Sequence, residues 1–253
     1  MIQRKTEWLN PDSSEIESYF LGQWNQTYRN TIMFYEWLNN IGLLNPNQTI
    51  CDLGCGAGSN TYYLWKNYDN LKLLGIDLSP KLIDIARYES KKRNANEIIY
   101  EIGNLYNLSN KYKNKFDGVI MVQVFSWIPD GYVVIKKITN LNPQWIAFSC
   151  LLNDSLVETE IRTKDYSRTE HGNFQEKTYN IYSIERIKKM FLDLGYDDFN
   201  IRPFEIDIDI DRNKDNKGMG TYTQKLDNGK RIQISGGILL NWYFVAVRKT
   251  KED

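Results

Sequence analysis

Two acids and three closely spaced glycines offer the clearest chemistry in this chain. Asp52 lies near the end of an apolar run, and Gly54, Gly56 and Gly58 follow it at alternate positions. Glycines let a backbone turn sharply and approach a ligand where a Cβ would collide. A second apolar run ends at Asp77, whose carboxylate can accept both hydroxyls of a ribose. These two segments therefore predict a nucleoside site.

The order of elements around this turn suits nucleoside binding. Ser59 is predicted to cap a helix that starts near Asn60, and the free amides and positive dipole end of such a helix favour negative charge. In open α/β sheets ligands bind at the carboxyl ends of the strands, where Asp77 is expected. Glycine turns also join many strands to helices without binding a ligand. Here, however, the acid follows at the interval of roughly 20 to 25 residues typical of a nucleoside site.

Two families share this architecture, and the acid before the first glycine separates them. Dinucleotide-binding folds usually have an apolar residue there and a third glycine at the position of Ser59. In this chain the run from Asp52 to Gly58 reads acid, apolar, Gly, x, Gly, x, Gly, which resembles the first motif of class I S-adenosylmethionine-dependent methyltransferases. A nicotinamide-dependent oxidoreductase and a non-catalytic module that binds S-adenosylmethionine are the alternative hypotheses.

Three later segments extend the resemblance over about residues 48 to 150. The run Asp77-Leu78-Ser79-Pro80 resembles the second motif, which implies that its acid binds the ribose and its leucine the adenine. The run Gly103-Asn104-Leu105 resembles the third motif, which commonly has an acid in place of the asparagine. An asparagine oxygen can still accept a hydrogen bond from the adenine amino group. Residues 116–123 resemble the fourth strand and the turn beneath the methyl donor.

The resemblance implies S-adenosyl-L-methionine as the cofactor and S-adenosyl-L-homocysteine as its product. The resemblance assigns donor binding to the motif residues and to two residues of the N-terminal segment. These two N-terminal residues are expected to reach the carboxylate of the donor. The motif residues are Asp52, Gly54, Cys55, Gly56, Asp77, Leu78, Asn104, Leu105 and Gln123, and the N-terminal pair is Tyr28 and Arg29.

The alternation of strand and helix patterns predicts an α/β fold with a mainly parallel sheet. Ser79 is expected to cap a helix that has Pro80 at its first position, and a second crossover helix is expected over residues 131–141. The resemblance adds a doubly wound sheet of seven strands whose last strand is antiparallel. Strands are predicted near residues 49–53, 72–77, 98–102, 117–122 and 144–150.

We expect a single methyltransferase domain over residues 1–253. Its predicted parts are a helical lid (1–46), a cofactor-binding core (47–152), a substrate-side insertion (153–182) and the C-terminal half of the sheet (183–253).

Alternation and turn signals predict three features of the C-terminal part. Residues 204–211 alternate apolar and acidic side chains, which predicts a strand with one acidic, solvated face rather than a metal site. Residues 221–234 are predicted to fold as a β-hairpin insertion about Asn228-Gly229. Residues 241–248 are predicted to form the last strand.

The residues expected to meet the methyl acceptor come from the lid and the insertion. His171 is the candidate general base because it is the only histidine, although a lone histidine in a polar loop is commonly a solvated surface residue. An anionic acceptor would need no base and would favour arginines such as Arg29 or Arg168. Aromatic side chains that could line the site, or pack in the core, are Trp24, Trp127, Tyr179, Tyr182 and Tyr222.

The absence of one motif and a resemblance in layout both bear on the class of methyl acceptor. After the fourth strand the chain reads Gln123-Val124-Phe125-Ser126, without the Asn or Asp followed by Pro-Pro and an aromatic that enzymes methylating flipped bases carry. The layout, with Gln23-Trp24 in the lid and residues 218–222 before the hairpin, resembles bacterial small-molecule methyltransferases of surface-carbohydrate (capsule) synthesis. This implies O-methylation of a capsule or polysaccharide precursor, at a sugar hydroxyl or a phosphoryl oxygen.

Composition limits the partners. The formal net charge is +0, from 32 basic and 32 acidic residues, which argues against broad attraction to nucleic acid. No apolar run reaches the roughly 18 residues of a membrane helix, and the N-terminus lacks an apolar signal core, so a cytoplasmic protein is expected. The 3 cysteines are too few for a disulfide framework, and no metal site is expected. The sequence does not indicate an oligomeric state.

Overall fold

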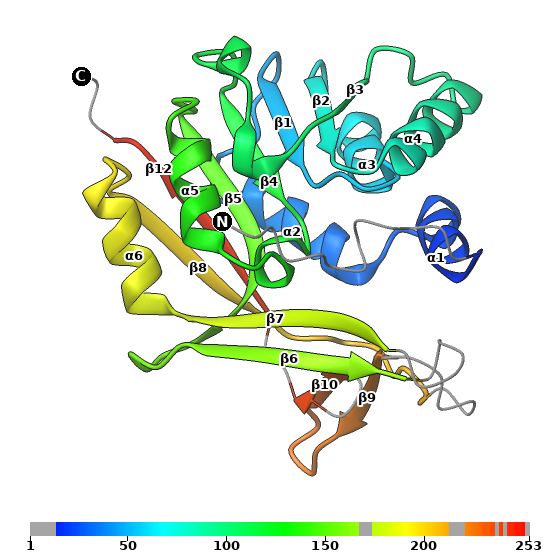
Figure 1. Ribbon diagram of the computed structural model, residues 1–253, viewed down its shortest axis with the longest axis vertical. Coiled ribbons are helices and arrows are strands. Elements are labelled where there is room, and N and C mark those ends of the chain that lie inside the picture. Colours follow the sequence, from blue (N-terminus) through cyan, green and yellow to red (C-terminus); the bar gives the residue numbers. More distant parts are fainter. Residues whose placement is uncertain (1–13, 167–173, 213–220, 236–237, 240–241, 251–253) are drawn as a thin grey trace.

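The computed structural model describes residues 14–166, 174–212, 221–235, 238–239 and 242–250. A twisted central sheet has helices on both faces (Figure 1). The strands of its main path follow the order β3-β2-β1-β4-β5-β12-β8. Their bounds are β1 Thr49–Leu53, β2 Lys72–Asp77, β3 Ile99–Ile102, β4 Gly118–Met121, β5 Trp145–Asn153, β8 Asp198–Phe204 and β12 Trp242–Arg248.

Strand β12 runs opposite to its two neighbours. It pairs antiparallel with β5 and with β8, whereas β1, β2, β3, β4 and β5 pair in parallel. The predicted mainly parallel sheet with an antiparallel last strand is therefore confirmed, and two further strands outside this path bring the predicted seven strands to nine. Because parallel strands end at one edge, the turns that follow β1, β2, β3 and β4 lie along the same side of the sheet.

Six helices surround the sheet in the described part of the chain. They are α1 Ser14–Asn25, α2 Arg29–Asn40, α3 Ser59–Asn67, α4 Pro80–Lys92, α5 Gly131–Thr139 and α6 Ile184–Asp193. Short 3-10 turns lie at η2 Leu105–Asn107, η3 Asn110–Tyr112 and η4 Phe125–Trp127. No helix among the described residues is long and apolar enough to cross a membrane.

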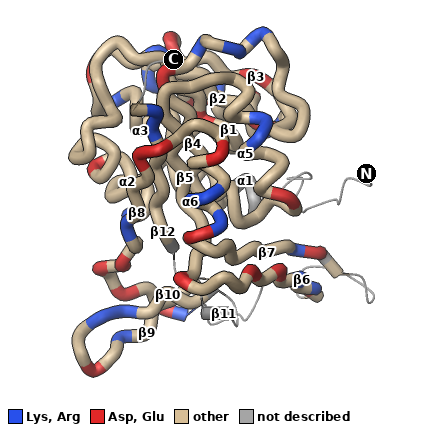
Figure 2. Tube along the Cα trace, turned by 90° about the vertical axis from the view of Figure 1, so that its left-hand side faces the viewer, with Lys and Arg blue, Asp and Glu red and all other residues tan. Residues whose placement is uncertain are grey.

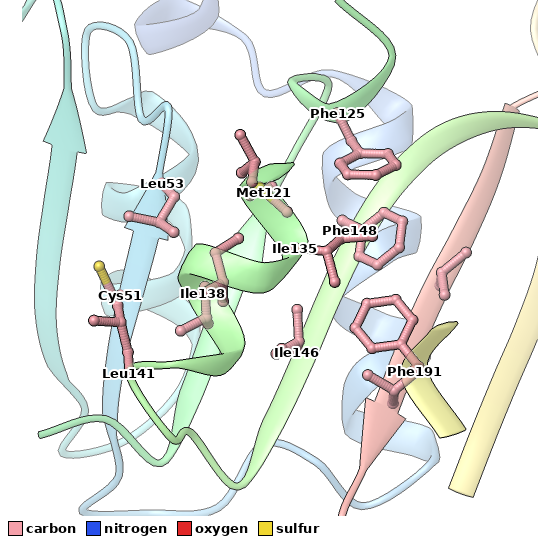
Figure 3. Packing of buried hydrophobic residues seen from close by; sticks show 14 of the residues in the cluster. Cys51, Leu53, Met121, Phe125, Ile135, Ile138, Leu141, Ile146, Phe148 and Phe191 are labelled. Carbon is pink, nitrogen blue, oxygen red and sulfur yellow. The ribbon is translucent and has the colours of Figure 1, made fainter. Parts of the chain in front are cut away.

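Alternate residues of the strands supply two cores, one on each face. One core packs the side chains on one face of the sheet against α5 and α6. It includes Phe125, Phe148 and Phe191 (Figure 3). The ring centroids lie 4.8 Å apart for Phe125 and Phe148 and 5.8 Å apart for Phe148 and Phe191. The second core joins the opposite residues to α2, α3 and α4. Burial on both faces explains why the central strands read as nearly continuous apolar runs.

The substrate-side insertion is a β-hairpin rather than an irregular polar segment. Its strands, β6 Thr159–Asp165 and β7 Gln175–Ser183, pair antiparallel. The last three residues of β7 also pair in parallel with the end of β5, at Leu151↔Ile181, Leu152↔Tyr182 and Asn153↔Ser183. In Figure 1 this hairpin lies beneath the carboxyl edge of the parallel strands.

A small second sheet lies beyond the hairpin. It contains β9 Thr221–Lys225, β10 Arg231–Ser235 and β11 Ile238–Leu239. The predicted β9–β10 hairpin is confirmed, and Gly229 takes the positive φ (+82°) expected in its turn. Figure 2 shows basic and acidic segments close together at this end of the molecule.

Two local predictions are wrong. Strand β8 ends at Phe204, and residues 205–212 are irregular instead of forming a strand. Their acids form ion pairs with other segments, in the pairs Glu205–Lys230, Asp207–Arg29 and Asp209–Arg231. Helix α3 begins at Ser59 with Gly58 as its N-cap, so Ser59 is not the cap, and its hydroxyl donates to the Gln23 side chain instead.

Candidate functional site

The glycine turn after β1 needs glycine at its alternate positions. Gly54, Gly56 and Gly58 have φ of +76°, +54° and +84°, a region that L side chains rarely adopt. The Gly54 N–H donates to the carbonyl of Ile76 on the neighbouring strand at 2.7 Å. The turn is therefore fixed against β2.

Asp77 connects the turn to the end of β2. One carboxylate oxygen accepts the Gly56 N–H, and the other accepts the Ser79 N–H, both at 2.9 Å. Burial raises the pKa of Asp77, while the backbone N–H groups of Ser79, Gly56 and Leu78 oppose that shift. Each oxygen keeps a second lone pair, so the carboxylate can still accept ribose hydroxyls.

Asp52 lies within β1, below the turn. It is 2% exposed and accepts a 2.6 Å hydrogen bond from the Thr61 hydroxyl. Burial raises the pKa of Asp52 to about 7, the Thr61 hydrogen bond lowers it, and the charge of Asp77 raises it further. Thr61 comes from α3 and was not predicted from the sequence, because a single hydroxyl residue on a helix does not indicate which strand residue it meets.

The residues assigned to the adenine follow two neighbouring strands. Leu78 follows β2 and is 37% exposed. Asn104 and Leu105 follow β3, which pairs with β2. The side-chain oxygen of Asn104 accepts the Tyr106 N–H at 2.9 Å and caps the short helix η2. This leaves the second lone pair of the oxygen and the amide N–H groups for a ligand.

Gln123 lies on the loop that follows β4, with φ of +59°. Its N–H donates to the Ser149 hydroxyl at 2.6 Å. The neighbouring Val124 packs against the glycine turn, since a Cβ added at Gly54 would lie 2.6 Å from Cγ2 of Val124. The loops after β1 and β4 are therefore in contact at the carboxyl edge.

Helix α1 packs on the glycine turn. The Phe20 ring lies where a Cβ on Gly56 would be, at 2.6 Å. The Trp24 indole N–H donates to the Ala57 carbonyl at 2.8 Å, and the Arg93 guanidinium lies 4.7 Å from the centroid of the Trp24 ring. Trp24 is 8% exposed, so its contacts in this structure are with the protein.

Tyr28 and Arg29 lie where α2 begins. The Tyr28 ring is 5.9 Å from the Tyr19 ring of α1. The Arg29 guanidinium forms a two-point ion pair with Asp207, in which Nε and Oδ1 are 3.0 Å apart. Both side chains are partly exposed, so Arg29 can exchange Asp207 for another carboxylate.

The predicted acceptor residues fall into three groups. Trp127 and Tyr179 meet, with ring centroids 4.1 Å apart. Tyr182 lies in the main core against Phe125, and Tyr222 lies on β9 in the small sheet. The remaining two candidates, His171 and Arg168, lie outside the described residues.

The site offers polar binding groups rather than metal ligands. Within the described ranges, no group of three or more His, Cys, Asp or Glu side chains is placed to hold a metal ion. The thiols of Cys51, Cys55 and Cys150 are buried, and burial raises the pKa of each well above its usual value. A buried neutral thiol is a poor nucleophile.

Comparison with known proteins identifies the family of this chain. The family model described as "Methyltransferase domain" matches residues 44–186, more than half of the 253-residue chain. Similar curated proteins include (S)-coclaurine N-methyltransferase of Thalictrum flavum subsp. glaucum, 24% identical over 43% of this chain and 28% of that protein. Malonyl-[acyl-carrier protein] O-methyltransferase of Priestia megaterium is 26% identical over 42% of this chain and 38% of that protein. The match thus spans less than half of either relative.

Solved structures share the fold. YcgJ from Bacillus subtilis has a TM-score of 0.60 at 11% identity and covers 89% of this chain and 100% of its own. The N-terminal domain of EvdMO1, with S-adenosylhomocysteine bound, has a TM-score of 0.58 at 10% identity and covers 88% and 82%. Magnesium protoporphyrin IX methyltransferase of Synechocystis, with S-adenosylmethionine bound, has a TM-score of 0.52 at 16% identity and covers 96% and 89%. By its family model, this chain belongs to the methyltransferase domain family.

Proposed function

We propose that this methyltransferase domain transfers a methyl group from S-adenosyl-L-methionine to an oxygen of a small polar acceptor. The observation that carries the proposal is the hydrogen bond between the Gly56 N–H and Asp77, which joins the glycine turn to the acid at the next strand end. This bond brings together the two segments that a nucleoside donor needs, at the edge of the sheet where α/β folds bind ligands.

We assign each donor contact to a residue at the carboxyl edge of the sheet. Asp77 would accept the ribose hydroxyls, and Leu78, Asn104 and Leu105 would border the adenine. The turn from Gly54 to Gly56 would approach the donor closely because it carries no Cβ at its glycines. Through its hydrogen bond with Thr61, Asp52 joins the strand before that turn to the helix after it.

The other end of the donor would lie between α2 and the loop after β4. Arg29 would exchange Asp207 for the donor carboxylate, with Tyr28 beside it, and Gln123 would face the reacting end. When bound, the sulfonium supplies an electrophilic methyl carbon. The protein then has to hold a nucleophile in line and keep water away.

We propose a capsule or polysaccharide precursor as the acceptor. Trp127, which is partly exposed and is backed by the buried Tyr179, would form one wall, because an aromatic face suits a sugar ring. One structure of the similar EvdMO1 domain was determined in the presence of S-adenosylhomocysteine and D-fucose. Relatives named for alkaloid and acyl-carrier-protein substrates indicate that this domain family serves varied acceptors.

The two acceptor atoms under consideration use different residues. A sugar hydroxyl would need a base, for which His171 is our candidate. A phosphoryl oxygen would need only a counter-charge, for which Arg168 is our candidate. We place this reaction in the cytoplasm and on one domain over residues 1–253, with α1 and α2 acting as the lid.

Ligand binding tests the donor. S-adenosylhomocysteine at about 100 times its Kd should stabilise the protein by ~2.7 kcal/mol in a thermal shift. NADH serves as the matched control at the same concentration. Stabilisation by NADH and none by S-adenosylhomocysteine would reject the donor and favour an oxidoreductase.

Transfer tests the acceptor. The protein and donor are incubated with a neutral methyl glycoside in one reaction and with a sugar phosphate in another, and products are detected by a gain of about 14 daltons. Because a sugar phosphate also carries hydroxyls, fragmentation of its product locates the methyl group, and methylation at the phosphoryl oxygen alone would reject the hydroxyl acceptor. Donor binding without transfer to these acceptors or to components of a native cell extract would favour a non-catalytic module.

A further inference from the structure

Two serine hydroxyls fasten the loop after β4 to strand β5. We call residues 122–127 the β4–η4 loop. The Gln123 N–H donates to Ser149 Oγ at 2.6 Å, and the Leu151 N–H donates to Ser126 Oγ at 2.7 Å. Both serines are buried, at 1% and 0% exposure. The bonds are reciprocal, because one uses a loop N–H with a strand side chain and the other a strand N–H with a loop side chain.

The first bond lies at the point where the parallel ladder stops. The last pair of β4 with β5 is Met121↔Phe148, so Gln123 is beyond the reach of the backbone ladder. The Ser149 side chain replaces the missing strand partner for the Gln123 N–H. Without the Ser149 hydroxyl, this part-buried N–H would lose its hydrogen-bond acceptor, which is unfavourable.

The same bond holds an uncommon backbone conformation. Gln123 has φ of +59°, in the left-handed region that non-glycine residues seldom adopt. Such a conformation persists when the surrounding structure fixes it. Ser149 provides that restraint at Gln123, and Ser126 provides a second restraint three residues later.

The β4–η4 loop contacts the glycine turn on the predicted donor side and the β6–β7 hairpin on the predicted acceptor side. Val124 packs on Gly54 of the glycine turn. Trp127, at the other end of the loop, packs on Tyr179 of the β6–β7 hairpin. A displacement of this loop would therefore alter the donor side and the acceptor side together.

We propose that Ser149 and Ser126 are positioning residues for methyl transfer. They hold the β4–η4 loop in the one conformation that directs Gln123 toward the donor and Trp127 toward the acceptor. This inference rests on the proposed function for the identity of the ligand. The competing explanation is that the two hydroxyls only satisfy buried N–H groups, in which case their loss would affect stability alone.

The experiment compares Ser149→Ala and Ser126→Ala with Ser183→Ala. Ser183 is a matched control because its buried hydroxyl also accepts a backbone N–H, that of Arg186 at the start of α6. We measure Tm, the Kd of S-adenosylhomocysteine by calorimetry, and amide exchange of a peptide covering residues 119–128 by mass spectrometry. Ser149→Ala should weaken binding about tenfold and raise loop exchange, whereas Ser183→Ala should lower Tm without either effect.

Equal Kd and equal loop exchange in the three variants would overturn the proposal. Ser126 restrains the loop from its other end, so Ser126→Ala keeps the test decisive if Ser149→Ala fails to fold. Ser149→Cys, which retains a weak acceptor, should recover part of the lost affinity.

The two proposals can fail separately. If the unaltered protein does not bind S-adenosylhomocysteine, the proposed donor is wrong. The exchange comparison without ligand would still show whether the two serines control this loop.

Discussion

The Trp24 indole N–H donates to the carbonyl of Ala57 across 33 residues of sequence, and this bond joins the first helix to the glycine turn. The turn is thus shaped from two directions. Asp77 holds it from the sheet, and α1 holds it from outside.

Replacing Trp24 by Phe should therefore weaken donor binding. The ring would remain beneath Arg93, but the Ala57 carbonyl would lose its donor, at a cost of about 1 kcal/mol. We expect Kd for S-adenosylhomocysteine to rise roughly fivefold by calorimetry. Trp37→Phe, a change in the core under α2, is the control and should lower Tm with Kd unchanged. An unaltered Kd in Trp24→Phe would show that α1 does not influence the turn.

Asp77→Ala should have a larger effect than Asp77→Asn. The alanine variant leaves the N–H groups of Gly56 and Ser79 without their acceptor and removes the predicted ribose contact. The amide retains one oxygen for these N–H groups. We expect S-adenosylhomocysteine affinity to fall by about 100-fold in the first variant and about tenfold in the second. Calorimetry showing normal affinity in both would exclude Asp77 from the donor site.

Asp52 should make stability depend on pH. Burial raises its pKa from 3.8 to about 7, so between these values the folded state keeps a proton that the unfolded state releases. Stability should therefore fall as pH rises from about 4 to 7 and level off above 7. Asp52→Asn should remove this slope and stabilise the protein at pH 8, relative to pH 5, by on the order of 1 to 3 kcal/mol.

Urea unfolding at pH 5 and pH 8 measures that slope. Asp84→Asn is the control, because it removes one carboxylate from a largely exposed position on a helix. An identical slope in Asp52→Asn and the unaltered protein would contradict the assignment.

Gln123→Gly and Gln123→Ala should separate backbone strain from ligand contact. Both variants lack the side chain expected at the donor, so both should weaken binding equally. Only glycine adopts φ of +59° without strain, and it should be more stable than the alanine variant by about 1 kcal/mol in urea unfolding. Different Kd values for the two variants would indicate that the loop backbone, rather than the side chain, determines affinity.

The positions of strands and helices could be predicted because burial on both faces leaves clear apolar runs. The predicted strand at 49–53 matches β1, and the predicted cap Ser79 accepts the Leu82 N–H. The β6–β7 hairpin was missed because its side chains are largely polar; even the buried Lys177 and Asp165 are charged, and they form an ion pair. The alternation at 204–211 led to the wrong prediction of a strand. Its acids form ion pairs with residues of other segments and do not make up the solvated face of a strand.

The residues predicted to bind the donor form recognisable motifs in the sequence, but their hydrogen-bond partners could not be predicted. Thr61 and Ser149 reach Asp52 and Gln123 from other segments, and Ser149 is 26 residues from its partner. Isolated hydroxyl residues carry no signal in the sequence until the sheet order is known. The same limit applies to Arg29, whose pairing with Asp207 joins residues 178 positions apart.

The junction between β5 and β7 suggests how this protein could acquire new selectivity. The hairpin of residues 154–180 leaves the sheet at the end of β5 and returns at three paired positions beside it. A hairpin of different length or composition could be exchanged between these points while the register of the central strands is preserved. Recombination at this junction would therefore diversify the proposed acceptor half of the molecule and leave the proposed donor half intact.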